Sequence, residues 1–135
     1  MKNFNIIQLY NVIQKEKSNG SVKFRYGLLR NESIIKSLIE PLMAVQLEMQ
    51  KMLEPYKKDL NNLDKNDSDY MIKVNQLKEK YKDTIKLYDD KSKEWEQILS
   101  EDVDATKIFE ISIDDVPQNI QTESMEILLF WGILK

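Results

Sequence analysis

Residues 38–57 read LIEPLMAVQLEMQKMLEPYK, a segment whose apolar residues keep a helical spacing although it contains two prolines. Pro41 and Pro55 are fourteen residues apart, and each follows a glutamate. A proline inside a helix removes one backbone hydrogen bond and costs on the order of 3 kcal/mol. Because the apolar pattern continues on both sides, we expect a helix that bends at both prolines. The alternative is a break at either Glu-Pro step, with proline at the first position of a new helix.

The apolar pattern extends beyond this segment in both directions. One series of apolar residues recurs every seven positions and a second series occupies the complementary position: Leu28, Ile35, Leu42, Met49, Tyr56 and Leu63, then Leu38, Val45 and Met52. This is a heptad repeat, weakened by Asn31 and Asp59, and it predicts a long helix of coiled-coil type over residues 28–63.

A second apolar series follows the polar turn at residues 64–69. Its members have the mean spacing of an α-helix and are Val74, Leu77, Tyr81, Ile85, Tyr88, Trp95 and Leu99. They predict a second helix over residues 68–100. Two helices of similar length joined by a short turn predict a long antiparallel helical hairpin, with the apolar stripes facing each other.

The two ends of the chain have a different character. Residues 4–17 predict a short N-terminal helix, and Ser21 is placed to cap the helix that follows the turn. Residues 106–113 alternate and are rich in β-branched side chains, so they predict a strand that ends at DDVP, residues 114–117. Its candidate partners are residues 2–7 and 22–26, and the second of these segments fits either a helix or a strand. Residues 122–134 predict a C-terminal helix capped by Thr122 and apolar on nearly every side.

These elements predict a mainly α protein with a minor β component (α+β minor). Its parts are the long antiparallel helical hairpin, a short N-terminal helix, one or two short strands and a C-terminal helix. We expect a single domain over residues 1–135, because this length suits one hydrophobic core. Residues 28–63 and 68–100 form the hairpin, and residues 1–27 and 101–135 pack as a small end module.

Composition narrows the class of function. The chain contains neither histidine nor cysteine, which removes the common catalytic triads and zinc sites, and it has no glycine-rich phosphate loop. Residues 64–75 resemble a calcium loop, but Asp69 stands where glycine is needed and Asn75 where glutamate is needed. We expect no enzyme, no metal and no cofactor. Without a long apolar run or a signal-like N-terminus, we expect no membrane span and a cytoplasmic location.

Two groups of residues are candidates for binding. The C-terminal LLFWGILK supplies Leu128, Phe130 and Trp131 as candidate contacts with a protein partner, because aromatic anchors dominate interfaces; the alternatives are core packing and self-association. Basic residues mixed with aromatics supply a candidate nucleic-acid site at Lys23, Arg25 and Arg30, for which the alternative is a solvated basic face.

The order of elements resembles a family of small helical proteins of unknown function encoded by tailed phages and prophages. The similar features are the KFRYGLLRN start of a long helix at residues 23–31, the charged hairpin turn, the second long helix, and the acidic stretch before DDVP. The resemblance covers most of the chain and implies a viral origin, with the host cytoplasm as the place of action. It carries no known activity and therefore no functional residues.

The sequence thus predicts a non-enzymatic protein–protein interaction protein. The expected role is that of a phage accessory factor that binds a host or virion protein, and we expect a homo-oligomer because the heptads exceed what a small core needs. The alternative is a nucleic-acid-binding accessory protein that uses the basic N-terminal region.

Overall fold

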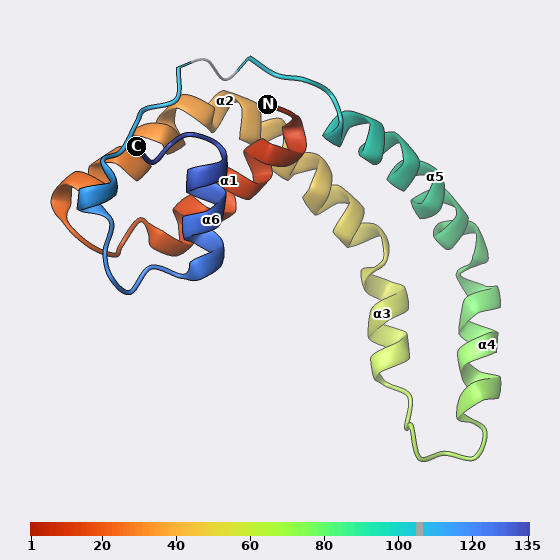
Figure 1. The fold of residues 1–135 in the computed structure, drawn as a ribbon. Coiled ribbons are helices and arrows are strands. Elements are labelled where there is room, and N and C mark those ends of the chain that lie inside the picture. The colour runs from red at the N-terminus through yellow and green to blue at the C-terminus, as the bar shows by residue number, and fades with distance from the viewer. Residues whose placement is uncertain (105–106) are drawn as a thin grey trace. The chain divides into compact units, whose positions relative to one another are not determined.

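Helices account for most of the chain in the computed structural model, which describes residues 1–104 and 107–135 (Figure 1). The elements in chain order are α1 (Asn3–Glu16), α2 (Val22–Met52), α3 (Glu54–Asn61), α4 (Tyr70–Lys80), α5 (Lys82–Leu99), the 3₁₀ helix η1 (Ile113–Asp115) and α6 (Thr122–Phe130). The prediction of a mainly helical protein is confirmed. The chain forms two compact units, residues 1–42 with 99–135 and residues 43–98, and α2 contributes to both.

The start of α2 shows whether residues 22–26 are helix or strand. Residues 22–26 are helical, so α2 begins six residues before the predicted start at residue 28. The hydroxyl oxygen of Ser21 accepts a hydrogen bond from the backbone N–H of Phe24 at 3.2 Å, which confirms the predicted cap. Residues 22–26 are therefore helix, the first of the two alternatives left open for them, and they are not a strand partner.

The two prolines behave differently. Pro41 lies inside α2, whereas Pro55 lies in the first turn of α3, just after α2 has ended at Met52. The expectation of one helix through both prolines is wrong at Pro55, because the first turn of a helix has free N–H groups and loses nothing to proline there. The predicted helix over residues 68–100 is likewise divided, at Tyr81, into α4 and α5.

The core of the first unit is built from α1, the first part of α2 and the C-terminal segment. Its buried apolar residues are Ile6, Leu9, Val12, Ile13, Phe24, Leu28, Ile35, Ile39, Leu42, Ile111, Leu128, Ile133 and Leu134. Gly27 lets α2 approach the C-terminal segment closely, because a Cβ atom at this position would lie 2.6 Å from Cγ1 of Ile111. The first three members of the heptad series thus serve an ordinary globular core.

No sheet is formed by the residues that the structure describes. The strand predicted over residues 106–113 is not confirmed; residue 106 lies outside the described residues, and Ile111 makes only an isolated parallel bridge with Leu134. Two residues before this bridge, a buried side chain bonds the backbone instead. Asn31 donates to the Phe109 carbonyl at 3.0 Å and accepts from the Phe109 N–H at 2.7 Å. The other predicted partner, residues 2–7, is helical from residue 3, and its one bridge joins Lys2 to Asp102.

The end of α6 also differs from the prediction. Gln121, and not Thr122, is the N-cap residue, and its N–H donates to the buried Glu16 carboxylate at 3.3 Å. The helix ends at Phe130 instead of residue 134, because Gly132 has a φ of +69° and turns the chain out of the helix. Residues 133 and 134 then return to the core.

The second unit contains the C-terminal part of α2 with α3, α4 and α5. The chain reverses in the loop between α3 and α4 (Figure 1). The Tyr56 and Tyr81 rings lie 5.4 Å apart, and the Tyr81 hydroxyl donates to Asp59 at 2.5 Å. Lys91 of α5 pairs with Glu48 of α2 at 3.7 Å. Among residues 43–98, all of which are described, Met49 is the one buried apolar side chain.

None of the described helices combines the length and the apolar character that a membrane crossing requires.

Candidate functional site

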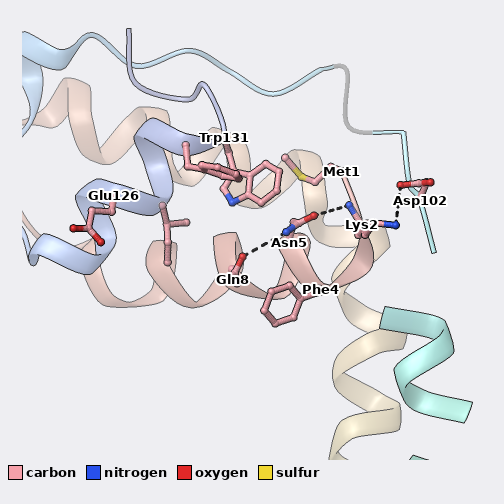
Figure 2. Close-up of a pocket in the computed structure, with 10 residues that line it drawn as sticks. Met1, Lys2, Phe4, Asn5, Gln8, Asp102, Glu126 and Trp131 are labelled. Atoms are coloured by element: carbon pink, nitrogen blue, oxygen red, sulfur yellow. Dashed lines mark hydrogen bonds and ion pairs between the residues drawn. The ribbon is translucent and has the colours of Figure 1, made fainter. Parts of the chain in front are cut away.

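A hollow of about 710 Å³ opens on the first unit between the start of α1, the end of α6 and residue 102 (Figure 2). We call it the α1–α6 groove. Its lining is mostly apolar and consists of Met1, Lys2, Phe4, Asn5, Gln8, Asp102, Glu126, Ile127, Phe130 and Trp131. Three segments that are far apart in the sequence therefore form one surface feature.

Aromatic side chains on the groove are unusually open to solvent. Phe130 is 77% exposed and Phe4 is 51% exposed. The Phe130 ring meets the Trp131 ring edge to face, with centroids 4.7 Å apart. Single exposed apolar residues are normal on a protein surface, and here two phenylalanines border the same hollow.

The local backbone explains why the two rings at the end of α6 stay at the surface. Trp131 is the C-cap residue of α6, and the left-handed Gly132 reverses the chain direction directly after it. The N–H of Ile133 then donates to the Leu128 carbonyl at 3.0 Å, which closes the helix end. Ile133 is fully buried by this turn, whereas Phe130, the last residue of α6, and the C-cap residue Trp131 stay outside the core.

Hydrogen bonds fix the opposite wall, at the start of α1. The Lys2 backbone N–H donates to Oδ1 of Asn5 at 2.8 Å, and Nδ2 of Asn5 reaches Oε1 of Gln8 at 3.5 Å. The Lys2 ammonium pairs with Asp102 at 3.7 Å and donates to the Ser100 carbonyl at 2.9 Å. Figure 2 shows the Lys2–Asn5, Asn5–Gln8 and Lys2–Asp102 contacts as one chain of interactions. This wall is therefore preorganised in the free protein.

The charged groups of the groove are not balanced. Lys2 is engaged by Asp102, whereas Glu126 is exposed and has neither an ion pair nor a side-chain hydrogen bond to any described residue. The lining therefore carries one basic and two acidic side chains, and one of the two carboxylates is uncompensated.

The three residues proposed from LLFWGILK divide between the surface and the core. Phe130 and Trp131 line the groove, but Leu128 is fully buried and has no surface with which to contact a partner. Phe4 was not singled out from the sequence, although a signal exists. It stands two positions before Ile6, about 200° around the helix from the buried face of α1. An aromatic residue on the polar side of a predicted helix is a reasonable marker of a contact surface.

The basic residues proposed as a nucleic-acid site are exposed on α2 but do not form one cluster. Lys23 and Arg30 are seven residues apart and share a helix face, while Arg25 points about 200° away from Lys23. The Arg25 side chain donates to the Lys17 carbonyl at 3.1 Å. The Arg30 guanidinium lies 4.4 Å from the centre of the Phe109 ring, a cation–π contact.

Acidic residues also lie beside these bases. A small hollow of about 150 Å³ is lined by Lys23 and Tyr26 together with the acidic residues Glu110 and Asp115, of which Glu110 pairs with Lys135 at 2.6 Å. Phosphate groups would meet these carboxylates as well as Lys23, so the electrostatic attraction is reduced. Within residues 1–104 and 107–135, no group of three or more acidic side chains has the geometry to hold a metal ion.

Comparisons of the chain with protein-family models, with curated proteins and with solved structures found no match. The class is therefore described by the fold and the site: a mainly helical protein that carries a preorganised, largely apolar groove with an exposed aromatic rim.

Proposed function

We propose that this protein acts by binding another protein, without catalysis, and that the α1–α6 groove is the contact surface. The observation that carries the proposal is the 77% exposure of Phe130 at the rim of an apolar hollow of about 710 Å³. Interfaces obtain most of their binding energy from a few aromatic or arginine anchors in desolvated pockets. The groove offers both parts of such a contact, an exposed ring and a hollow beside it.

We further propose that the partner is a host or virion protein and that the protein acts in the host cytoplasm as a phage accessory factor. This part rests on the resemblance to phage and prophage proteins in residues 23–31 and in the DDVP segment at residues 114–117.

We also propose that residues 43–98 form an antiparallel helical hairpin of coiled-coil type that pairs with a second copy. Support comes from the lack of burial, since Met49 is this unit's one buried apolar residue and four large apolar side chains are half-exposed or more: Leu47, Met71, Ile72 and Leu87. Residues 43–98 contain 11 basic and 12 acidic side chains, so two copies would not repel each other strongly. A second hairpin would complete a four-helix arrangement around the half-buried stripes.

The groove proposal is tested by selecting peptides from a displayed random library against the full chain. The selected peptides are then titrated against Phe130→Ser and against Leu129→Ser as the matched control. Leu129 is 45% exposed on the same helix but does not line the groove. We expect Phe130→Ser to weaken binding by about 10-fold or more, as loss of an interface anchor does, and Leu129→Ser to leave it unchanged. Equal binding to all three proteins would show that the groove is not the contact surface.

The nucleic-acid alternative is not proposed as a second function. Arg25 and Arg30 are engaged within the protein, and Glu110 and Asp115 lie next to Lys23. Nucleic-acid binding is tested by titrating the unmodified protein and Lys23→Glu with DNA and RNA at low salt, where the phosphate attraction is strongest. Binding by the unmodified protein that Lys23→Glu weakens would support this alternative.

A further inference from the structure

We infer that the α1–α6 groove takes a basic amphipathic segment of the partner, in which a bulky apolar side chain enters the hollow and a lysine or arginine lies against Glu126. This inference rests on the proposed function and adds the chemical class of the ligand.

The apolar part of the groove sets the first requirement. Phe4, Ile127 and Phe130 supply apolar surface from two helices, and the volume of about 710 Å³ falls in the range of sites that bury several apolar groups. Because Phe130 is largely exposed in the free protein, a ligand that covers its ring removes apolar surface from water, which favours binding. The ligand must therefore present at least one large aliphatic or aromatic side chain.

The charges of the groove set the second requirement. The Lys2 ammonium lies 3.7 Å from Asp102 and donates to the Ser100 carbonyl at 2.9 Å, so its charge is directed toward these two groups. Glu126 has no such partner among the residues that the structure describes. When a ligand covers the groove, this carboxylate loses water, and a cation from the ligand is the compensation that keeps the contact favourable.

The spacing of the two features on α6 sets the third requirement. Glu126 and Phe130 are four residues apart, so the carboxylate and the ring lie on one helix face about one turn apart. A helical ligand matches this arrangement when a lysine or arginine stands three or four positions from its apolar anchor. An acidic or phosphorylated segment that covered the Phe130 ring would place its negative charges against Glu126.

The surrounding charge favours the same ligand over longer distances. Residues 101–135 contain 2 basic and 8 acidic side chains, and Glu123 lies one turn before Ile127 on α6, loosely paired with Lys15 at 3.9 Å. This acidic field attracts a basic segment before contact and is weakened by salt.

The test uses two labelled peptides of about four helical turns with identical leucine and phenylalanine positions. One carries lysine at every polar position and the other carries glutamate. Fluorescence anisotropy with the full chain at low salt should show the lysine peptide binding at least about 10-fold more tightly. Glu126→Lys should remove most of this preference, and Phe130→Ser should weaken the lysine peptide by a similar factor. Glu96→Lys is the matched control, because it makes the same charge change on α5, outside the groove.

The possible results separate the inference from the proposed function. If the glutamate peptide binds as well as the lysine peptide, and both depend on Phe130, the inference is wrong while the groove remains a contact surface. If Glu96→Lys reduces the preference as much as Glu126→Lys does, the preference is a property of net charge and the inference also fails. If the lysine peptide binds equally well to Phe130→Ser, or if neither peptide binds, the groove does not take this class of ligand. In that case the library-selected peptides still test the proposed function.

Discussion

Asn31 is a buried polar side chain that holds together two distant parts of the first unit. It is fully buried, and the nitrogen and the oxygen of its side-chain amide each form a hydrogen bond with the backbone of Phe109. Asn31→Leu would remove both of these part-buried hydrogen bonds, each of which contributes about 0.5–1.5 kcal/mol. We expect the free energy of unfolding to fall by about 1–3 kcal/mol, measured by urea unfolding with Trp131 as the fluorescent reporter in a Trp95→Phe background.

The control for this experiment is Asn11→Leu, which makes the same chemical change at an exposed position of α1. Surface substitutions of this kind usually change stability by less than about 0.5 kcal/mol. A similar loss in both variants would contradict the role given to Asn31.

The sequence offered little indication of this role. In the heptad pattern Asn31 is a polar residue that interrupts the apolar series. The contact that decides its function is with a residue 78 positions away. Such pairing depends on the tertiary fold, so the spacing of residues along one helix cannot reveal it.

Tyr81 is the titratable residue that tests the contact between α3 and α4. Its hydrogen bond to Asp59 raises the pKa of the Tyr81 hydroxyl, because the carboxylate accepts from the neutral phenol and repels the phenolate. The bond stabilises the fold below the ordinary tyrosine pKa, and this stability is lost as pH rises through the raised pKa. We expect Tyr81 to titrate at lower pH in Asp59→Asn than in the unmodified protein. The measurement is the tyrosinate absorbance of each protein minus that of its Tyr81→Phe version, and titration at the same pH in both would contradict the contact.

At the scale of elements, the two prolines should respond in opposite ways to the same substitution. Pro41→Ala restores a backbone donor and removes a ring clash inside α2, so we expect the free energy of unfolding to rise by about 1–3 kcal/mol. Pro55→Ala changes a first-turn position where proline suits the helix, so we expect a change within about 1 kcal/mol or a small loss. Urea unfolding of the two variants side by side is the measurement. A larger gain from Pro55→Ala would contradict the different placement of the two residues.

The helices were predictable from the sequence because their signals are local. Periodic apolar residues predicted α1 and most of α2, and Ser21 was recognised as a cap, although the long helix was predicted from residue 28 and α2 begins at Val22. The break before Pro55 was present as an alternative that spacing alone could not decide. The break at Tyr81 has no glycine or proline to mark it, and the apolar series continues through it.

The C-terminal segment could have been predicted better. Gly132 follows directly after an aromatic pair and has the left-handed conformation that commonly ends helices, so it marks the end of α6 at Phe130. The extended backbone near Ile111 could not have been placed from sequence, because its partners are Asn31 and residues 133–135 instead of a regular strand.

At the scale of the whole molecule, self-association should depend on the second unit. We expect sedimentation velocity of the full chain to show a dimer whose population grows with concentration. Ile72→Lys and Leu87→Lys replace side chains that are 59% and 50% exposed, so they should weaken the dimer without unfolding the protein. Val22→Lys, at an 81% exposed residue of the first unit, is the control. A monomer at every concentration, or equal weakening by all three substitutions, would contradict the pairing of hairpins.

The groove was only partly predictable from the sequence, because it forms between segments that are far apart in the chain. Phe130 and Trp131 could be recognised as candidate anchors because they are large aromatic side chains. The groove itself needs residues 1–8, residue 102 and residues 126–131 to meet, and only the folded chain shows that they do. The charge imbalance at Glu126 follows from that meeting, since it depends on Lys2 being occupied by Asp102.

The chain carries its own reporters for binding of a partner segment in the α1–α6 groove. Of its two tryptophans, Trp131 lines the groove and Trp95 lies on α5 in the second unit. The most direct measurement is a heteronuclear correlation spectrum of the full chain, in which each indole N–H gives its own signal, during titration with a library-selected peptide. We expect the Trp131 signal to shift and the Trp95 signal to stay in place. Saturable peptide binding that moves the Trp95 signal and leaves Trp131 in place would contradict binding in the groove.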